Sequence, residues 1–395
     1  MNLTATAQAT LLLTSYFSAA KNEECKPLSN TEWGRFALWL RHQQLVPADL
    51  LAAGAETHLA HWNDSDIPVS RIMTLLGRSH SLALAVEKWQ RAGLWIVTRA
   101  DADYPVRLKN QLKNDSPPVL FGCGNRALLS KGGLAIVGSR NAINDDLHFT
   151  ETLAQKLAEE GMNVVSGGAR GVDEHAMLAA LAAGGTATGI LADSLIKAAT
   201  FAKWRQGLMS SNLVLISPFY PEAGFSVANA MSRNKYIYCL ADSSLVVHAG
   251  MKGGTLSGAL EALKHQWVPL WVKPTDDQQS SNVQLVQKGG RWCAQDAHDI
   301  LPATLRASRN YTPAQTQPML FSLQEPSAPY STSGVDFYSL FLRELNRLAQ
   351  TPVTLEVLLS ETKLHKEQIT VWLEKAMIEG SVECLSDPVR YQLRQ

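Results

Sequence analysis

The sequence predicts an α/β protein with a doubly wound, Rossmann-like parallel sheet, a helical N-terminal domain and a C-terminal winged helix. From residue 134 onward, short apolar runs alternate with helical stretches, which is the pattern of βαβ units and a parallel sheet. Before that point, apolar residues recur at spacings of three and four, as in amphipathic helices. At 395 residues the chain is also too long for one simple core, so we expect several domains.

The composition is that of an ordinary globular protein, with 46% hydrophobic and 18% charged residues. Lysine plus arginine equals aspartate plus glutamate at 36 each, so the formal net charge is zero. This balance argues against a protein that binds DNA by overall charge, although it allows a local basic groove. The five cysteines are scattered without a CxxC pair, so we expect reduced thiols, no disulfide framework and no metal site. No cofactor is expected either.

The apolar stretch "LLLTSYFSAA" at residues 11–20 is the strongest candidate for a targeting or membrane segment. It lacks a basic region before it, and it is too short to span a bilayer. We therefore expect a cytoplasmic protein with no membrane partner.

Residues 1–127 are predicted to form a helical (SAM-like) N-terminal domain that ends in the strand candidate "LWIVT" and several proline turns. Four tryptophans lie among leucines at helical spacing in this region. They are Trp33, Trp39, Trp62 and Trp89. Tryptophan can stack on bases, but this spacing favours a place in the core.

Residues 128–300 are predicted to form the Rossmann-like core. Its six strands are expected at "LAIVG", "NVVSG", "TATGIL", "LVLIS", "SLVVH" and "VPLWVK". Helices are expected at 145–160, 172–183, 228–240 and 255–264. Such alternation predicts a doubly wound sheet of ordinary domain size.

Residues 301–334 are rich in Pro, Ser, Thr and Gln, which is typical of a linker. Residues 335–395 then show three helical stretches and two short strands around Asp387-Pro388, which predicts a winged helix. In its expected recognition helix, lysines are balanced by glutamates, whereas duplex readers present Arg, Lys, Asn or Gln. A protein partner is therefore as plausible there as duplex DNA.

Three glycine-rich turns follow predicted strands and precede predicted helices: "AIVGSRNA", "SGGARGVD" and "HAGMKGGTLSGALEAL". In an open parallel sheet, ligands bind at the carboxyl ends of the strands, and small residues there let backbone N–H groups approach an oxyanion. The candidate residues in these turns are Gly138, Ser139, Arg140, Ser166, Gly167, Gly168, Arg170, Gly171, Lys252, Gly253, Gly254 and Thr255. The alternative for any single turn is glycine that serves only a tight bend.

A fourth stretch, "NAMSRNKYIYCLAD", places Arg233 and Lys235 at the expected start of a helix. Cations there oppose the helix dipole, so contact with an anion is the better explanation for them. Phosphates are therefore expected across Arg140, the Gly167–Gly171 loop, Arg233 and Lys252.

The order of these motifs resembles the DprA/Smf family, the DNA-processing protein A group. "GLWIVTRADADYPVRLKN", "AIVGSR", "SGGARGVD", "LISPFYPEAGFSVANAMSRNKYI" and "MKGGTLSGALEAL" are similar to the family's motifs in the same order. The resemblance covers about residues 90–275. It implies a protein without catalytic activity that binds single-stranded DNA, forms a homodimer and loads a RecA-like recombinase during natural transformation. Ser139, Arg140, Ser166, Gly167, Gly168, Arg170, Gly171, Arg233 and Lys235 match the family's strand-binding positions.

Several departures from the family pattern indicate a divergent member. Met177 stands where the family has a histidine, and Lys235 replaces the second arginine of its RNR motif. "LADSLIKAA" replaces its "GxGxDxxYP" segment, and Ser257-Gly258 replaces its "TA". Divergent members also occur in anti-phage defence loci beside a toxin, so an antitoxin or regulator with a cognate toxin as partner is an alternative.

The sequence also resembles the LOG-type nucleotide phosphoribohydrolases, which is the enzymatic alternative. In that interpretation the Gly253–Thr255 turn holds a phosphate, Arg233 grips it and Glu261 stabilises the ribosyl cation. No proline precedes the glycines here, and five residues separate Thr255 from Glu261 where the family motif has two. The non-enzymatic interpretation is therefore favoured.

Two further side chains are candidates for ligand contact. His175 begins an apolar helix and is expected to be a polar cap or packed residue rather than a ligand. Trp204, between Lys203 and Arg205, is a candidate for base stacking, and a solvated helix face is the equal alternative.

Overall fold

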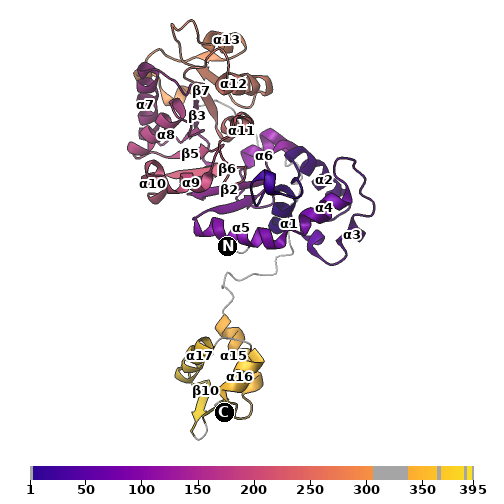
Figure 1. Ribbon diagram of the computed structural model, residues 1–395. Helices are drawn as coiled ribbons and strands as arrows, with labels where there is room; N and C mark the ends of the chain where they lie inside the picture. Colours follow the sequence, from indigo (N-terminus) through magenta and orange to yellow (C-terminus); the bar gives the residue numbers. More distant parts are fainter. Residues whose placement is uncertain (1–2, 306–336, 363–365, 387–388, 394–395) are drawn as a thin grey trace. The chain divides into compact units, whose positions relative to one another are not determined.

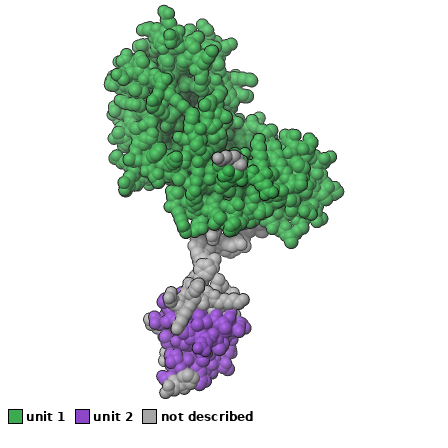
Figure 2. Space-filling view, in the orientation of Figure 1, with its two compact units in different colours: residues 1–322 green, residues 323–395 purple. Residues whose placement is uncertain are grey.

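A computed structural model describes residues 3–305, 337–362, 366–386 and 389–393 of the chain (Figure 1). The chain divides into two compact units, residues 1–322 and 323–395 (Figure 2). Of the predicted linker 301–334, only the first five residues are described, and they contain the short helix α14 (Pro302–Leu305). The remainder of that prediction lies outside the described residues.

The predicted N-terminal helices are present. They are α1 (Ala5–Thr14), α2 (Asn30–His42), α3 (Ala55–His58), α4 (Val69–Leu76) and α5 (Ser79–Arg91). Helix α2 begins at a capping box, in which Ser29 and Glu32 each accept a hydrogen bond from the other's backbone N–H. The four tryptophans belong to the core as expected: Trp33 and Trp89 are buried, and Trp39 and Trp62 are partly buried with ring centroids 5.1 Å apart.

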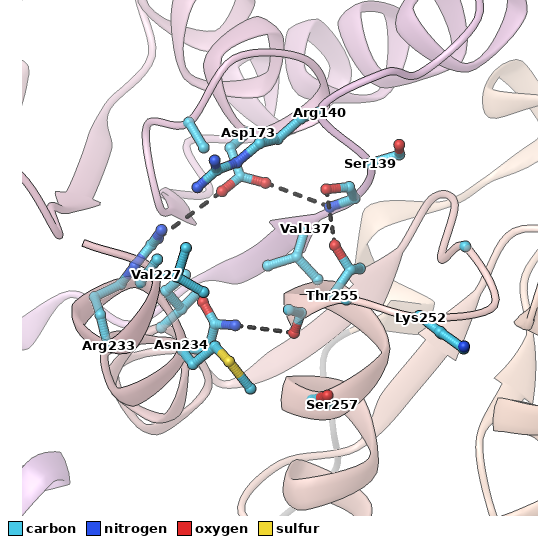
Figure 3. A pocket seen from close by; sticks show the side chains of 18 of the residues that line it. Val137, Ser139, Arg140, Asp173, Val227, Arg233, Asn234, Lys252, Thr255 and Ser257 are labelled. Carbon is cyan, nitrogen blue, oxygen red and sulfur yellow. Dashed lines mark hydrogen bonds and ion pairs between the residues drawn. The ribbon is translucent and has the colours of Figure 1, made fainter. Parts of the chain in front are cut away.

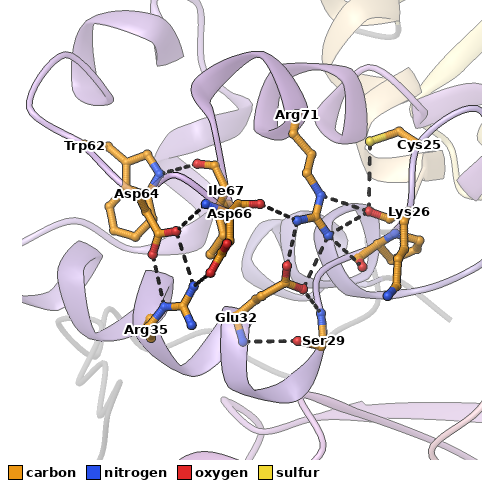
Figure 4. Close-up of polar contacts among 11 residues, drawn as sticks. Cys25, Lys26, Ser29, Glu32, Arg35, Trp62, Asp64, Asp66, Ile67 and Arg71 are labelled. Carbon is orange, nitrogen blue, oxygen red and sulfur yellow. Dashed lines mark hydrogen bonds and ion pairs between the residues drawn. The ribbon is translucent and has the colours of Figure 1, made fainter.

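One arginine ties this helical region together (Figure 4). Arg71 on α4 donates to both carboxylate oxygens of Glu32, at 2.7 and 3.3 Å, and to the backbone carbonyl of Asp66 at 2.7 Å. It also donates to the carbonyls of Lys26 and Pro27, at 3.1 and 3.2 Å. Every one of these acceptors comes from a segment outside α4, so Arg71 fixes how the helices and their loops meet.

The main sheet has nine strands in the order β1-β2-β6-β5-β4-β3-β7-β8-β9. The strands are β1 (Trp95–Thr98), β2 (Val119–Gly124), β3 (Leu134–Val137), β4 (Val164–Ser166), β5 (Ala187–Ile190), β6 (Leu213–Ser217), β7 (Ser243–Val246), β8 (Leu270–Val272) and β9 (Arg291–Trp292). The six predicted strands are β3–β8, and they pair in parallel as predicted. β9 extends them in parallel, whereas β2 and β1 add antiparallel strands at the other edge.

Helices cover both faces of this sheet because side chains along each strand alternate between them. Leu134 and Ile136 belong to one apolar cluster, and Ala135 and Val137 belong to the other. The first cluster is closed by α7 (Asn144–Glu159), α8 (Val172–Ala182), α9 (Leu195–Thr200) and α10 (Ala202–Met209). The second is closed by α6 (Val106–Leu112), α11 (Val227–Leu240), α12 (Gly254–His265) and α13 (Asn282–Gln287). The doubly wound prediction is thus confirmed, with the four predicted helices in place.

The sheet continues across residue 127, where the predicted N-terminal domain ends. Strands β1 and β2 precede that residue, yet β2 pairs with β6 from Phe121↔Ser217 to Gly124↔Val214. The ring of Trp89 on α5 also packs against Phe121 of β2, with centroids 5.0 Å apart. The helical region and the sheet therefore share one apolar cluster, and the predicted boundary between domains 1–127 and 128–300 stays a prediction.

Strand β3 lies at the place in the sheet where a ligand site is expected. From β3 the chain passes to β4 on one side, whereas from β7, on the other side of β3, it passes to β8, so the connections that follow β3 and β7 run in opposite directions. In open α/β sheets, a crevice opens at the carboxyl ends of the strands where the order reverses.

In its described residues, the second unit contains three helices and a strand pair, as predicted. They are α15 (Phe337–Leu348), α16 (Leu355–Thr362), α17 (Lys366–Ile378), β10 (Val382–Leu385) and β11 (Arg390–Leu393). Its own core includes Phe341, Leu345, Ile369 and Leu373. The strands pair antiparallel around residues 387–388, which lie outside the described part of the chain. Assignment of this unit as a winged helix stays a prediction.

Candidate functional site at the carboxyl ends of β3 and β7

A cavity of about 430 Å³ lies where the sheet order reverses (Figure 3). Its walls are the turn after β3, one side of α11 and the loop that leads into α12. Eight residues predicted from the sequence line it: Gly138, Ser139, Arg140, Arg233, Lys252, Gly253, Gly254 and Thr255. Tertiary structure therefore brings two of the three glycine-rich turns and the Arg233 helix to one cavity, and the third turn reaches it through Ala169 and Asp173.

The turn after β3 supplies an exposed cation. The Arg140 guanidinium lies 4.7 Å from the ring centroid of Phe225, which is itself half exposed. The Ser139 hydroxyl accepts a hydrogen bond from the Asn141 backbone N–H at 3.1 Å. This wall therefore presents a positive charge beside an aromatic ring.

The opposite wall is the start of α12. Gly253 caps this helix with a φ of 124°, a conformation that L side chains rarely adopt. The Thr255 hydroxyl donates to the Gly138 carbonyl at 3.0 Å, and the Asn234 side-chain amide donates to the Gly254 carbonyl at 2.9 Å. These bonds hold the start of α12 against β3 and α11. Its first N–H groups have no acceptor within the helix, and exposed Lys252 lies beside them.

The floor of the cavity holds a buried arginine–carboxylate pair. Arg233 Nη1 lies 3.9 Å from Asp173 Oδ2, and the two side chains are 5% and 9% exposed. The Gly138 N–H donates to Asp173 Oδ1 at 3.3 Å. A Cβ atom on Gly167 would lie 1.4 Å from Arg233 Nη1, so the absence of a side chain there makes room for the guanidinium.

This pair is poorly supplied with hydrogen bonds. Among the described residues, Arg233 Nε, Arg233 Nη1 and the Tyr238 hydroxyl are buried and have no hydrogen-bond partner. Burial raises the pKa of Asp173 to about 6, although Arg233 and the backbone N–H groups of Gly138 and Gly167 oppose that rise. Burial likewise lowers the pKa of Arg233. The charge of Arg233 is thus paired with that of Asp173 in the floor, whereas Arg140 and Lys252 are exposed at the walls.

The prediction that Arg233 and Lys235 begin a helix is wrong. Helix α11 begins at Val227, where the Ser226 hydroxyl accepts from the Asn229 N–H at 3.4 Å, so both cations lie in its middle. The conflict with the helix dipole therefore does not arise, and Arg233 is explained by its pairing with Asp173. Lys235 lies outside the lining residues, with its Nζ 5.4 Å from the Tyr236 ring centroid.

Of the predicted Gly167–Gly171 loop, Ala169 lines the cavity, and the rest of the loop packs behind it. Ser166, Gly167, Gly168, Arg170 and Gly171 are all outside the lining residues. The buried Ser166 hydroxyl donates to the Ile136 carbonyl, and Arg170 donates to the Asn141 side chain. A Cβ on Gly171 would lie 2.4 Å from the Ser139 carbonyl oxygen. Close packing on the β3 turn thus accounts for Gly171, and phosphate contact by this loop stays a prediction.

Two weaker candidates are also placed by the structure. Trp204 is 2% exposed, so both alternatives, base stacking and a solvated helix face, are wrong; its ring belongs to the core. His175 lies partly exposed on α8 with its Nδ1 2.5 Å from Glu151 Oε1, which agrees with a structural rather than a ligand-binding role.

Sequence reasoning missed one side of α11. Phe225, Val227, Met231, Asn234 and Tyr238 all line the cavity. Val227, Met231, Asn234 and Tyr238 follow the three- and four-residue spacing of a single helix face. That spacing was the available signal once Ser226 had been recognised as the helix cap.

The described residues also bear on membrane and metal partners. No helix in that part of the chain is both long and apolar enough to cross a membrane. Within the same residues, no three His, Cys, Asp or Glu side chains gather in a way that could hold a metal ion.

Comparison with known proteins decides the family. The family model described as DNA recombination-mediator protein A matches residues 95–304, which is more than half of the chain. The chain belongs to this family. The resemblance to the DprA/Smf group is thereby confirmed, and the matched range contains every residue that lines the cavity.

Curated relatives of the DNA recombination-mediator protein A family agree with this. DNA processing protein DprA of Bacillus subtilis is 28% identical over 225 residues, which cover 54% of this chain and 73% of that protein. Protein Smf of Escherichia coli is 27% identical over 242 residues, which cover 58% of this chain and 63% of that protein. The match to Smf thus spans less than two thirds of its length.

Two solved structures are similar to this chain, and the first of them supports the fold. The structure of DNA processing protein A from Streptococcus pneumoniae superposes with a TM-score of 0.56 at 20% identity, covering 76% of this chain and 97% of that one. A structure of DNA processing protein A from Helicobacter pylori, which concerns the single-stranded DNA binding mode of that protein, has a TM-score of 0.43 at 27% identity. It covers 50% of this chain and 90% of the other.

Proposed function

We propose that this protein binds single-stranded DNA during DNA processing and recombination, and that the β3–β7 cavity holds the sugar–phosphate backbone. The observation that carries the proposal is the pair of exposed cations, Arg140 and Lys252, on opposite walls of one cavity beside the start of α12. Phosphate contacts are made by Arg and Lys together with backbone N–H groups at helix starts. Membership of the DNA recombination-mediator protein A family supports the same conclusion.

In this proposal the predicted residues have two kinds of role. Arg140 and Lys252 neutralise phosphates, and the Gly254 and Thr255 N–H groups and the Ser139 hydroxyl add neutral contacts. Arg233 is a positioning residue, because its guanidinium faces Asp173 in the buried floor and Asp173 in turn accepts from the Gly138 N–H. The floor thereby holds the Gly138–Arg140 turn in place.

We also propose that the site binds without catalysing a reaction. The LOG-type alternative needs Glu261 beside the ribose, but Glu261 lies outside the residues that line the cavity. The RecA-like recombinase, the homodimer and the alternative role as an antitoxin beside a toxin stay predictions. A defence role would keep the same strand-binding cavity.

The test is fluorescence anisotropy with a labelled single strand, a duplex of the same sequence and AMP as competitor, over a series of salt concentrations. Arg140→Ala and Lys252→Ala are each expected to weaken single-strand binding and to lower the slope of log K against log salt by about 0.7, the value for one phosphate contact on a single strand. Competition by AMP with no strand binding would contradict the proposal and favour a nucleotide site.

Matched controls come from the same elements. Lys264 is exposed at the opposite end of α12, and Arg205 is exposed on α10 outside the cavity. Lys264→Ala and Arg205→Ala are expected to leave the salt slope unchanged. Equal losses in the controls would mean that the strand follows overall charge rather than this cavity.

A further inference from the structure

The turn that carries Lys252 is rich in glycine. It runs from Ala249 to Gly254, between β7 and the first residue of α12, and Figure 3 shows Lys252 on it. Gly250, Gly253 and Gly254 lie within these six residues. Glycine loses more conformational freedom on folding than any other residue, because it has no side chain to restrict the backbone. Contacts with another segment therefore have to supply the order of this turn.

That segment lies between β8 and α13, at residues 274–282, and we call it the clamp segment. Its last part runs beside the Lys252 turn, with an antiparallel bridge between Gly250 and Ser280. The Ser281 N–H donates to the Ala249 carbonyl at 2.7 Å, and the Ser281 hydroxyl donates to the Gly250 carbonyl at 3.2 Å. The first half of the glycine-rich turn is thus bonded to the clamp segment.

Asn282, the last residue of the clamp segment, ties the turn to two strands. Its side chain is fully buried, and its Oδ1 accepts from the Ala249 N–H at 3.0 Å. Its Nδ2 donates to the carbonyls of Val247 and Lys273, at 2.9 and 2.8 Å, which directly follow β7 and β8. Loss of this amide would leave buried backbone groups without partners, so Asn282 serves the fold as well as the turn.

The other attachment of the clamp segment is a histidine–carboxylate contact. His248 Nε2 lies 2.9 Å from Asp277 Oδ2, and the two side chains are 16% and 44% exposed. Asp277 Oδ1 accepts from the Gln279 N–H at 2.8 Å. The hydrogen bonds from His248 and from the Gln279 N–H lower the pKa of Asp277, so the carboxylate is ionised at neutral pH. Because His248 directly precedes Ala249, this contact fixes the clamp segment at the point where the turn begins.

The surroundings of His248 are poor for a residue that only stabilises the fold. Its Nδ1 is buried and has no hydrogen-bond partner among the described residues. A buried polar atom without a partner is destabilising, and an apolar side chain of similar size would avoid that loss. The contribution of the imidazole is therefore its Nε2 contact with Asp277, which lies beside the Lys252 turn.

We propose that His248 and Asp277 are positioning residues for strand binding, because their contact holds the Lys252 turn in the conformation that meets a phosphate. This inference rests on the proposed function. Neither side chain lines the cavity, whereas Gly250, Lys252 and Gly253 of the turn do, so the pair acts through the turn. A turn that is ordered in advance loses less entropy when the strand binds. The pair thereby raises affinity without a phosphate contact of its own.

The first experiment measures binding of a labelled oligo-dT strand to the full chain by fluorescence anisotropy over a series of salt concentrations. His248→Met and Asp277→Ala are each expected to weaken binding about threefold to tenfold, from the usual net contribution of one hydrogen bond. His248→Gln should bind nearly as the wild type does, because the glutamine amide nitrogen can reach the position of Nε2. The salt slope should stay unchanged in all three, whereas Lys252→Ala should lower it by about 0.7.

A double-mutant cycle tests whether the pair acts through the turn. Combined with Lys252→Ala, His248→Met should lose most of its effect on affinity, because the side chain that it positions is absent. Additive losses in the double variant would show that His248 acts elsewhere, and they would overturn the inference.

A second experiment examines the turn without DNA. Lys252 is exposed and is followed by glycine, so trypsin can cleave the turn when it opens. Cleavage after Lys252, identified by the mass of the fragments, should be faster in His248→Met and Asp277→Ala than in the wild type. His248→Gln should be cleaved at the wild-type rate. Equal rates in all four proteins would show that the pair does not order the turn.

A matched control pair exists elsewhere on the sheet. His175 on α8 lies with its Nδ1 2.5 Å from Glu151 Oε1 on α7, and the two side chains are 39% and 41% exposed. It reproduces the histidine–carboxylate contact away from the Lys252 turn. His175→Met and Glu151→Ala are expected to keep the wild-type affinity and the wild-type rate of cleavage after Lys252.

The outcomes separate this inference from the proposed function. Wild-type affinity in His248→Met and Asp277→Ala would overturn the inference and leave the phosphate site standing. A lower salt slope in these variants would also overturn it, because the pair would then contact phosphate directly. If the wild type binds no strand, the proposed function fails and the role in binding falls with it, while the cleavage rates still show whether the pair orders the turn.

Discussion

Arg71 in the helical N-terminal region and Arg233 in the cavity floor both face a carboxylate, but their surroundings differ. Arg71 donates to both oxygens of Glu32 and to three backbone carbonyls, and the Arg71 and Glu32 side chains remain 16% and 18% exposed. Arg233 and Asp173 are 5% and 9% exposed, and two of the guanidinium nitrogens of Arg233 have no acceptor among the described residues.

The pKa values of the two carboxylates move in opposite directions for this reason. Burial would raise the pKa of Glu32, but hydrogen bonds from Arg71 and Ser29 outweigh it and lower the pKa to about 2. Burial raises the pKa of Asp173 to about 6, because the neighbouring Arg233 and backbone N–H groups only partly offset it. An arginine–carboxylate pair therefore stabilises the folded protein where all its polar atoms are hydrogen-bonded. Buried pairs that lack some of these hydrogen bonds are typical of functional sites.

The largest expected effect tests this contrast with paired substitutions. The double variant Glu32→Gln/Arg71→Met should lose about 3 kcal/mol of unfolding free energy, because the carbonyls of Lys26, Pro27 and Asp66 lose a charged donor. The double variant Asp173→Asn/Arg233→Met should lose about 1 kcal/mol of unfolding free energy or less. Both members of a buried pair with missing hydrogen bonds are replaced together, so neither charge is left without its partner. Urea unfolding at pH 7 measures both. Equal losses of unfolding free energy in the two double variants would show that the number of hydrogen bonds does not decide how much each pair stabilises the fold.

The next effect concerns the space that Gly167 leaves. Gly167→Ala would place a Cβ 1.4 Å from Arg233 Nη1, so the guanidinium must shift, at a cost of about 2 kcal/mol. Gly77 at the end of α4 is the matched glycine, because it has a φ of −67° and a Cβ there would meet carbonyl oxygens at an ordinary 3.5 Å. Gly77→Ala should be neutral or stabilising by under about 1 kcal/mol. Thermal unfolding of both variants checks the difference, and a neutral Gly167→Ala would refute the close fit of the floor.

The pH dependence of stability should have opposite signs in the two regions. Because the folded pKa of Asp173 is raised from 3.8 to about 6, its contribution is complete below pH 3.8 and is lost as pH rises through 6. Because the folded pKa of Glu32 is lowered from 4.5 to about 2, its contribution is complete above pH 4.5 and is lost as pH falls toward 2.

Two isosteric variants measure these slopes. As the pH rises from 4 to 7, the unfolding free energy of the wild type should fall by about 1–3 kcal/mol relative to that of Asp173→Asn. The reason is that Asp173 loses a proton in this range, whereas asparagine has none to lose. The disadvantage of Glu32→Gln should shrink as pH falls below 4.5. Urea titrations at several pH values give both differences, and parallel curves for the wild type and Asp173→Asn would show that Asp173 does not titrate in this range.

The smallest effect compares two helix caps. Ser29 takes part in a complete capping box, with the Ser29 N–H donating to Glu32 Oε2 at 2.7 Å, whereas Ser226 accepts a single bond of 3.4 Å from Asn229. Ser29→Ala should cost about 1 kcal/mol and Ser226→Ala about 0.5 kcal/mol. Strand affinity should fall only in Ser226→Ala, because that cap orders the first half of α11 at the cavity. A change of affinity in Ser29→Ala would contradict the separation of the two regions.

Much of the core could be predicted because its signals are local. The apolar runs of β3 to β8 and the glycines at their ends identify strands, turns and helix starts without any knowledge of distant contacts. Gly138, Arg140 and Gly253 were placed in the cavity because carboxyl ends of parallel strands meet at one edge. The addition of β1 and β2 to the same sheet was not predicted, because pairing with β6 depends on contacts nearly a hundred residues apart.

The sequence by itself determined strands β3 to β8 and the four predicted helices among them, that the sheet is doubly wound, and which turns meet at its reversal point. Side-chain periodicity and glycine placement are sufficient for that, since they act within a few residues. Only the tertiary structure decided that Arg233 faces Asp173 across the space left by Gly167, and that Phe225 and Met231 remain at the rim. Burial and the distance between charges set those roles, and both arise only when remote segments pack together.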